Sequence, residues 1–165
     1  MDEASFLPEF CNKEILILGC GNSLFGDDGF GPAVAEYLVN RYRIPSNVYV
    51  ADTGTGVRKI LFTLCVSPRL PKRIVLVDAV DKGRKPGEIF ELLLEDVPME
   101  KIDDFSMHQV PSSNLALTLR NAGVDVHVKV CQVERIPDSV EPGLTKAVAE
   151  AVPRMCEEIV AEHFL

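Results

Sequence analysis

The sequence is short of the residues on which the commonest metal and redox sites depend. Its 165 residues include three histidines, no tryptophan and five cysteines, and no two cysteines are spaced as Cys-x-x-Cys. Five scattered cysteines argue against a disulfide framework and a structural zinc knuckle, so we expect free thiols in a reducing cytoplasm. Basic residues are also few, 17 against 25 acidic ones, and the net charge of −8 disfavours nucleic acid and anionic membranes as partners.

Long apolar runs and several familiar catalytic motifs are missing as well. The longest stretch without Asp, Glu, Lys or Arg, Phe105–Leu119, is interrupted by polar residues and proline, so we expect no transmembrane helix there. Met1–Phe10 holds three acidic residues where a secretory signal would be basic and then apolar. Neither the Gly-x-Ser-x-Gly elbow nor the His-Glu-x-x-His motif of common zinc proteases occurs. The length and the 47% hydrophobic content predict one domain, residues 1–165.

Apolar strand-like runs alternate along the chain with amphipathic helical stretches. We expect strands at Glu14–Gly19, Val48–Asp52, Arg73–Asp78 and Val124–Val133, an edge strand within Gly87–Leu93, and helices at Pro32–Asn40, Val57–Cys65, Ser112–Asn121 and from Pro142 to about Phe164. This alternation predicts an α/β fold with a mostly parallel sheet and helices on both faces. Ligands of such sheets bind outside the carboxyl ends of the strands, where the strand order reverses.

The glycine-rich segment Gly19–Pro32 follows the first expected strand and looks like a phosphate loop. However, Leu24 stands where a dinucleotide fingerprint has its third glycine, and Asp27 and Asp28 stand where a Walker loop has Lys and Ser or Thr. Two carboxylates would repel a phosphate, whereas they suit a cation. The alternative is that one of these aspartates caps the following helix.

Asp78 and the three histidines are the other residues with chemical potential. Asp78 ends the third expected strand, and a 2-1-3 strand order would make it face the Asp27–Asp28 loop, although an aspartate there could simply begin a turn. His108 lies in a polar loop before a helix, as a candidate ligand or as an ordinary surface histidine. His127 and His163 fall within a strand and at a helix end, which predicts structural roles, with His163 favourable for the helix dipole.

The candidate site is therefore the set Asp28, Asp78 and His108. Because it includes an imidazole, this set suits nickel or zinc better than magnesium, and it leaves coordination positions open for water or substrate. A nucleophilic pair of Cys20 and His108 is an alternative. A cysteine just after a buried strand is more often a small apolar core residue.

Several motifs together resemble one known family. Gly19–Gly31 resembles the signature Gly-x-Gly-Asn-x-Leu-x-x-Asp-(Asp/Glu)-Gly-x-Gly of the hydrogenase maturation proteases. Further segments that are similar to motifs of that family follow in the same order: Asp52–Gly56, Leu76–Ala79, Lys85–Glu88, Met107–Gln109 and Glu141–Thr145. The resemblance implies a three-layer αβα sandwich with a mostly parallel, twisted sheet.

The same resemblance implies the activity and its residues. It implies a nickel-dependent endopeptidase that removes the C-terminal extension of a nickel–iron hydrogenase large-subunit precursor after nickel insertion. The catalytic and nickel-binding residues it implies are Asp28, Asp78 and His108, with Asp28 where many members have Glu. The nickel would be carried by the precursor, and zinc or cadmium could substitute for it in a crystal. The wording of the first motif is similar to the archaeal type that serves the coenzyme F-420-reducing hydrogenase.

Two other classes of protein, and the proton-transfer group, stay open at the level of sequence. A non-enzymatic maturation chaperone could use the same three residues to hold nickel. A flavodoxin-like nucleotide or flavin domain is disfavoured by Asp27 and Asp28, which would repel phosphate. For the protease, either Asp27 or Asp81 could act as general base, and the backbone of Thr53–Gly56 could cradle an extended peptide.

Overall fold

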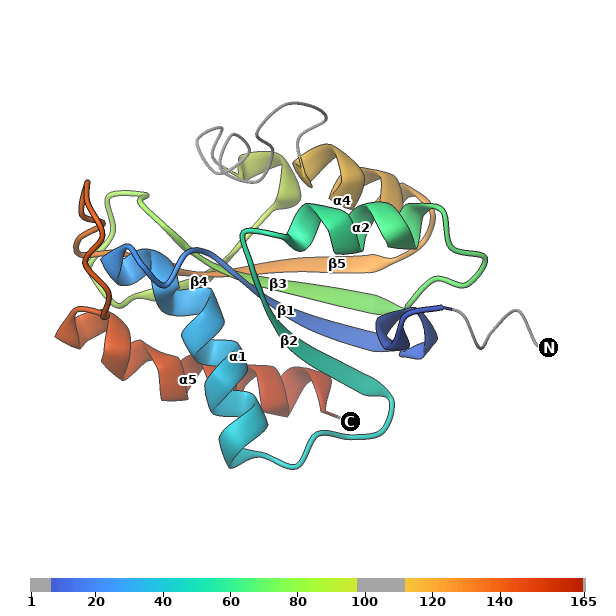
Figure 1. Ribbon diagram of the computed structural model, residues 1–165, viewed down its shortest axis with the longest axis horizontal. Helices are drawn as coiled ribbons and strands as arrows, with labels where there is room; N and C mark the ends of the chain where they lie inside the picture. The colour runs from blue at the N-terminus through green and yellow to red at the C-terminus, as the bar shows by residue number, and fades with distance from the viewer. Residues whose placement is uncertain (1–6, 98–111, 165) are drawn as a thin grey trace.

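The computed structural model describes residues 7–97 and 112–164 of the chain and places a five-stranded sheet at its centre (Figure 1). Its strands are β1 (Ile15–Cys20), β2 (Val48–Gly54), β3 (Arg73–Val80), β4 (Ile89–Leu92) and β5 (Asp125–Gln132), in the order β2-β1-β3-β5-β4. Strands β2, β1, β3 and β5 are parallel, and β4 pairs antiparallel with β5 at the edge. The predicted mostly parallel sheet and its edge strand are confirmed, and β2, β1 and β3 have the 2-1-3 order that would make Asp78 face the Asp27–Asp28 loop.

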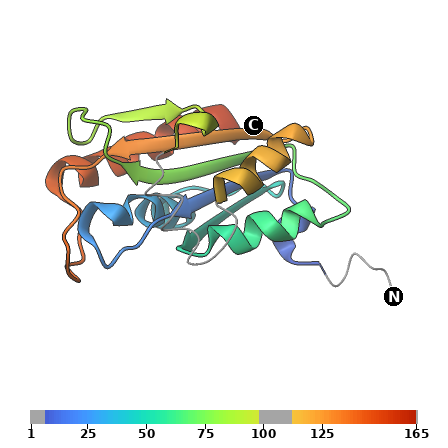
Figure 2. The ribbon, with the colours of Figure 1, turned by 90° about the horizontal axis from the view of Figure 1, so that it is seen from above.

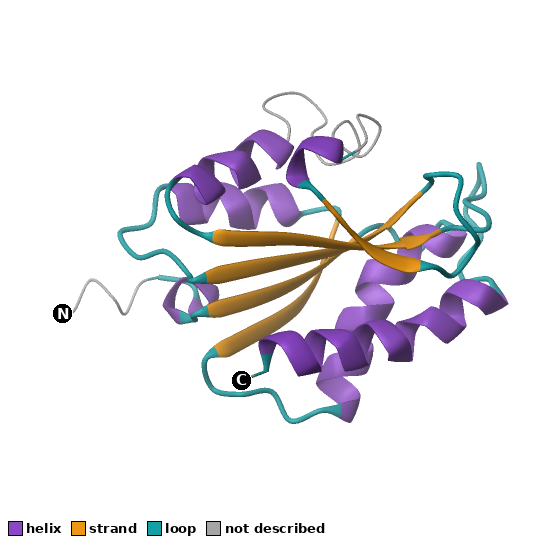
Figure 3. Cartoon of the chain, turned by 180° about the vertical axis from the view of Figure 1, so that it is seen from behind, coloured by secondary structure: helices purple, strands orange, loops and turns teal. Residues whose placement is uncertain are grey.

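Helices cover both faces of the sheet, as Figures 2 and 3 show. Helices α1 (Phe30–Arg41) and α5 (Lys146–His163) pack on one face, and α2 (Val57–Cys65) and α4 (Ser112–Asn121) on the other. Each pair encloses its own apolar cluster against the sheet. Strands β1 and β3 are apolar almost throughout because both of their faces are buried. The predicted three-layer α/β arrangement is thus confirmed.

Two helices begin elsewhere than the sequence predicts. Helix α1 starts at Phe30 instead of Pro32, and its N-cap is Gly29, with no side-chain capping bond. The alternative in which Asp27 or Asp28 caps this helix is therefore wrong. Helix α5 starts at Lys146, because Thr145 is extended, with φ −64° and ψ 160°. Among the described helices, none is long and apolar enough to cross a lipid bilayer.

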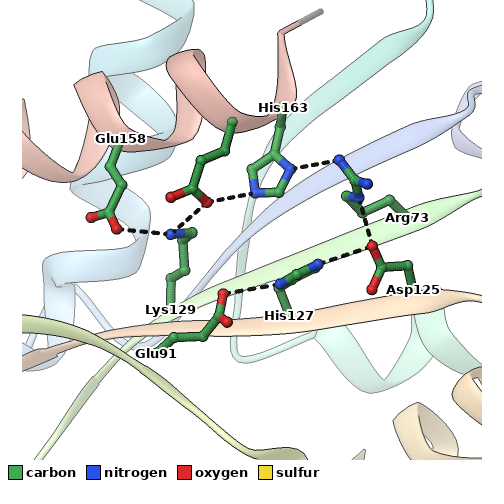
Figure 4. Close-up of polar contacts among 8 residues, drawn as sticks. Arg73, Glu91, Asp125, His127, Lys129, Glu158 and His163 are labelled. Carbon is green, nitrogen blue, oxygen red and sulfur yellow. Dashed lines mark hydrogen bonds and ion pairs between the residues drawn. The ribbon is translucent and has the colours of Figure 1, made fainter.

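A network of polar side chains lies between the C-terminal half of α5 and the sheet (Figure 4). Its members are Arg73, Glu91, Asp125, His127, Lys129, Glu158, Glu162 and His163. At its centre Lys129 is only 3% exposed, and its Nζ lies 3.2 Å from Glu158 Oε1 and 3.0 Å from Glu162 Oε2. Burial lowers the pKa of Lys129, but the two glutamates outweigh this effect and raise it, so the ammonium stays charged.

His163 lies in this network between Arg73 and Glu162 as a neutral imidazole. Its side chain is buried, and Nδ1 lies 3.2 Å from Nη1 of Arg73. A guanidinium can only donate, so Nδ1 accepts this bond and the ring proton sits on Nε2. Burial and the charge of Arg73 lower the pKa of His163 from 6.5 to about 4. The prediction that His163 favours the helix dipole is therefore wrong, because the ring carries no charge near neutral pH.

The low pKa of His163 predicts an acid-sensitive fold. Between pH 6.5 and about 4 the unfolded chain binds a proton at this ring and the folded chain does not. The free energy of unfolding should therefore fall as the pH drops through this range, by roughly 3 kcal/mol at most for a shift of this size. Urea titrations at a series of pH values would measure this, with His163→Gln as the control that keeps an acceptor for Arg73. A slope that is equal in the two proteins would contradict the assignment.

Candidate functional site

The ends of β1 and β2 are joined by backbone and side-chain hydrogen bonds. The amide of Gly21 donates to the carbonyl of Gly54 over 3.0 Å, and the Thr53 hydroxyl donates to the carbonyl of Gly19 over 2.9 Å. Asp52 Oδ1 accepts from the amide of Gly54 over 2.8 Å and so holds the turn after β2. The glycine-rich segments at the carboxyl ends of the two strands therefore lie side by side and form the carboxyl-end edge of the sheet.

The backbone of Asp28 and the side chain of Asp78 both lie beside Gly21 at this edge. A methyl group built on Gly21 would lie 2.0 Å from the carbonyl oxygen of Asp28 and 3.5 Å from Oδ1 of Asp78. Because β1 lies between β2 and β3, the segment after β1 must pass beside the end of β3, where Asp78 is located. The prediction that Asp78 faces the loop of Asp27 and Asp28 is confirmed.

The two carboxylates differ in exposure and in the bonds that orient them. Asp28 lies in the short helix η3 (Gly26–Gly29) and is half-buried, and its Oδ2 accepts from the amide of Asn22 over 2.9 Å. Asp78 is 6% exposed, and its Oδ1 accepts from the amide of Ala79 over 2.7 Å. Each carboxylate is thus held by a backbone amide, which limits the geometries in which it can bind a cation.

The third predicted ligand, His108, lies outside the described residues. Within residues 7–97 and 112–164 no three His, Cys, Asp or Glu side chains are grouped closely enough to hold a metal ion. A metal site that uses Asp28 and Asp78 would therefore need a further ligand. The predicted pairing of Cys20 with His108 likewise falls outside the described residues.

The first predicted base, Asp27, has a different role from its neighbour Asp28. Its side chain is fully buried, and both of its oxygens accept hydrogen bonds from the segment 134–145. A carboxylate enclosed in this way cannot reach a peptide at the surface, so the structure argues against Asp27 as the base. The sequence places Glu141–Thr145 at the start of the expected last helix. Nothing in that segment indicates that it contacts Asp27.

Asp81 remains at the surface after β3. Its Oδ1 accepts from Gln132 Nε2 over 3.1 Å and from the amide of Gly83 over 3.2 Å. The bond from Gln132, followed by that from Gly83, lowers the pKa of Asp81. A carboxylate whose charged form is stabilised in this way is a weaker base, and its bonds assign it to the turn between β3 and β4.

The cysteines are free thiols in largely apolar surroundings. Four of the five are buried: Cys11, Cys20, Cys131 and Cys156. Burial raises the pKa of Cys131 and of Cys156 to about 12, so neither forms a thiolate near neutral pH. Cys20 is 2% exposed, and its thiol donates to the carbonyl of Leu18 over 3.5 Å. This position favours the structural interpretation of Cys20 over a nucleophile.

The fold and these residues define a doubly wound α/β protein with an acidic site at the switch point of its sheet, between β1 and β3. Residues 32–162 match the hydrogenase maturation protease family. The chain is 41% identical to a Methanocaldococcus jannaschii protein assigned to these proteases, covering 91% of this chain and 96% of that one. It is 36% identical to the coenzyme F-420 hydrogenase subunit delta of Methanothermobacter thermautotrophicus, covering 92% and 95%.

A solved structure gives the same answer. The endopeptidase HycI of Escherichia coli superposes with a TM-score of 0.69 at 27% identity, covering 90% of both chains. The chain belongs to the hydrogenase maturation protease family, and it is a peptidase. The resemblance noted in its motifs is thereby confirmed, and the chaperone and flavodoxin-like alternatives are set aside.

Proposed function

We propose that the protein removes the C-terminal extension of a nickel–iron hydrogenase large-subunit precursor, and that nickel already held by the precursor is bound by Asp28, Asp78 and His108. The observation that carries this proposal is the position of Asp28 and Asp78 beside Gly21. The backbone of Asp28 and the carboxylate of Asp78 both lie beside Gly21, at the end of the sheet where ligands of such folds bind. The likeness to the coenzyme F-420 hydrogenase subunit delta supports the F-420-reducing enzyme as the source of the precursor.

The chemistry of the ligands supports nickel or a similar borderline ion. Carboxylate oxygens alone suit hard ions such as magnesium, and the imidazole of His108 shifts the preference toward nickel and zinc. Because the metal arrives with the substrate, an empty precursor would lack the contacts that bring its peptide to Asp28 and Asp78. Nickel would thus act as a checkpoint that admits only loaded precursor.

The metal also accounts for the chemistry that the side chains do not supply. Asp27 is enclosed and Asp81 has a lowered pKa, so neither is a strong general base. A cation that polarises the scissile carbonyl, or a water molecule beside it, would replace such a base. The backbone of Thr53 and Gly54 lies next to Gly21. We propose that this backbone contacts the extended peptide. The free thiols fit a reducing cytoplasm as the place of reaction.

The test is cleavage of nickel-loaded precursor compared with nickel-free precursor. The protein is incubated with each form, and the mass of the large subunit is followed over time. We expect loss of the C-terminal peptide from the loaded form only, with at least about a hundredfold difference in rate, the size of effect that one electrostatic contribution makes. Equal rates for both forms would contradict the proposal that nickel acts as a checkpoint. Cleavage of neither form would contradict the proposed substrate.

A further inference from the structure

Asp27 is a buried charged residue for which the proposed reaction has no use. Its side chain has no exposed surface, although it adjoins Asp28 in the short helix η3. Burial of a carboxylate is unfavourable unless hydrogen bonds replace its water, so such a group requires an explanation. The contacts of Asp27 supply that explanation.

Four donors converge on the Asp27 carboxylate from one distant segment of the chain. The amides of Glu134 and Arg135 donate to Oδ2 over 2.8 and 2.9 Å. The amide of Thr145 donates to Oδ1 over 2.7 Å, and its hydroxyl lies 3.0 and 2.9 Å from the two oxygens. Thr145 is the N-cap residue of α5, yet its hydroxyl makes no capping bond to that helix. The hydroxyl is directed to Asp27 instead.

Backbone bonds join the same two segments along their length. The amide of Asp27 donates to the carbonyl of Arg135 over 3.2 Å, and the amide of Gly26 donates to the carbonyl of Glu141 over 2.9 Å. The amide of Glu141 donates back to the carbonyl of Leu24 over 2.8 Å, and Phe25 and Glu141 form an isolated parallel bridge. The loop that carries Asp28 is therefore attached to residues 134–145 at Asp27 and at the three residues before it.

This attachment holds in place the residues directly before Asp28. The amide of Asp28 donates to the carbonyl of Phe25 over 3.1 Å, which is a bond within the loop itself. Its carboxylate accepts from Asn22, which belongs to the same loop. The bonds that tie residues 24–27 to a second segment are those made with residues 134–145. A shift of one ångström in this loop would move the Asp28 carboxylate by a similar amount, which is enough to weaken a metal contact.

We propose that Asp27 is a positioning residue of the peptidase reaction, whose carboxylate clamps the Asp28 loop onto residues 134–145 and so holds Asp28 at the end of the sheet where Asp78 lies. This role rests on the proposed function, in which Asp28 contacts the precursor's nickel. The clamp requires an aspartate, because all four groups around it donate. An asparagine would turn its amide donors toward backbone N–H groups, which cannot accept.

The experiment compares steady-state cleavage of nickel-loaded precursor by the whole protein and by three variants. Asp27→Asn should lower kcat at least tenfold, with KM changed less than twofold, because docking surfaces elsewhere are intact. Thr145→Val removes only the hydroxyl and should lower kcat about threefold. Thr145→Ser keeps the donor and should restore the rate of the unmodified protein. Circular dichroism at the assay temperature gives the folded fraction, to which every kcat is normalised.

A matched control separates positioning from a loss of stability. Lys129→Met removes another buried charged group, which lies in the network of α5 and whose partners are Glu158 and Glu162. It should change the urea midpoint while leaving kcat per folded molecule unchanged. Should Asp27→Asn behave like Lys129→Met, or Thr145→Ser fail where Thr145→Val fails, Asp27 has a structural role only and the inference is overturned.

The outcome also distinguishes this inference from the proposed function. Failure of the unmodified protein to cleave loaded precursor, or full activity of Asp28→Asn, would contradict the proposed function itself. Normal cleavage, an inactive Asp28→Asn and an undiminished kcat per folded molecule in Asp27→Asn would contradict only the clamp.

Discussion

Replacing Asp28 or Asp78 by asparagine should lower the rate of precursor cleavage about a hundredfold or more. Each substitution keeps the size of the side chain and an acceptor oxygen, so the bonds from Asn22 to Asp28 and from Ala79 to Asp78 can persist. What is lost is the negative charge that a nickel ion requires from its oxygen ligands. The measurement is the single-turnover rate with nickel-loaded precursor, followed by the mass of the large subunit.

Exposed acidic residues elsewhere provide the control for this result. Glu36 lies on the solvent side of α1, and Glu36→Gln removes one negative charge without touching the strand ends. Its rate should stay within a factor of two of that of the unmodified protein. If Glu36→Gln and Asp28→Asn lower the rate alike, the effect belongs to the net charge of the protein, and the assignment of Asp28 as a ligand is wrong.

The substitution Gly31→Ala should strongly destabilise the fold. A methyl group built on Gly31 would lie 2.2 Å from the carbonyl oxygen of Cys20 and 2.4 Å from that of Val77. These are backbone atoms of two central strands, so the strain can be relieved only by moving α1 away from the sheet. We expect a loss of about 3 kcal/mol or more in the free energy of unfolding. Urea denaturation followed by circular dichroism would measure it.

Gly56→Ala is the matched control for this substitution. The added methyl group would approach only the carbonyl oxygen of Thr53, at 3.3 Å, and Gly56 is an exposed residue at the N-cap of α2 rather than one packed against a strand. Its effect should be within about 1 kcal/mol. A similar loss in both variants would show that general backbone entropy, and not the contact of α1 with β1 and β3, accounts for the cost of Gly31→Ala.

The strands and most helices could be predicted because their signals are local. Val57–Cys65 and Ser112–Asn121 are helices with the predicted bounds, and β3 continues two residues beyond its predicted end at Asp78. Continuous apolar runs specify strands buried on both faces, whatever the rest of the chain does. The start of α5 was not predictable in this way, because a contact with Asp27 holds Thr145 in an extended conformation.

The candidate site shows the same division between neighbouring residues. The order of the motifs alone brings the Asp27–Asp28 loop and Asp78 together, because parallel strands bring their carboxyl ends to one edge. Adjacent aspartates are indistinguishable in the sequence, yet Asp27 is enclosed by residues 134–145 and Asp28 is half-exposed. Which of two neighbours faces inward depends on a segment more than a hundred residues away.

The composition and the histidines show the same difference between what the sequence determines and what only the folded chain determines. Composition alone determined an acidic chain with three histidines and no disulfide framework, and its patterns determined the order of strands and helices. Only tertiary structure decided that His163 is neutral, that Asp27 is a clamp and that α1 needs a glycine against β1. The physical reason is the distance along the chain over which the interacting residues are separated. Secondary structure follows from the periodicity of nearby residues, whereas burial, pKa and hydrogen-bond partners depend on groups that only the folded chain brings together.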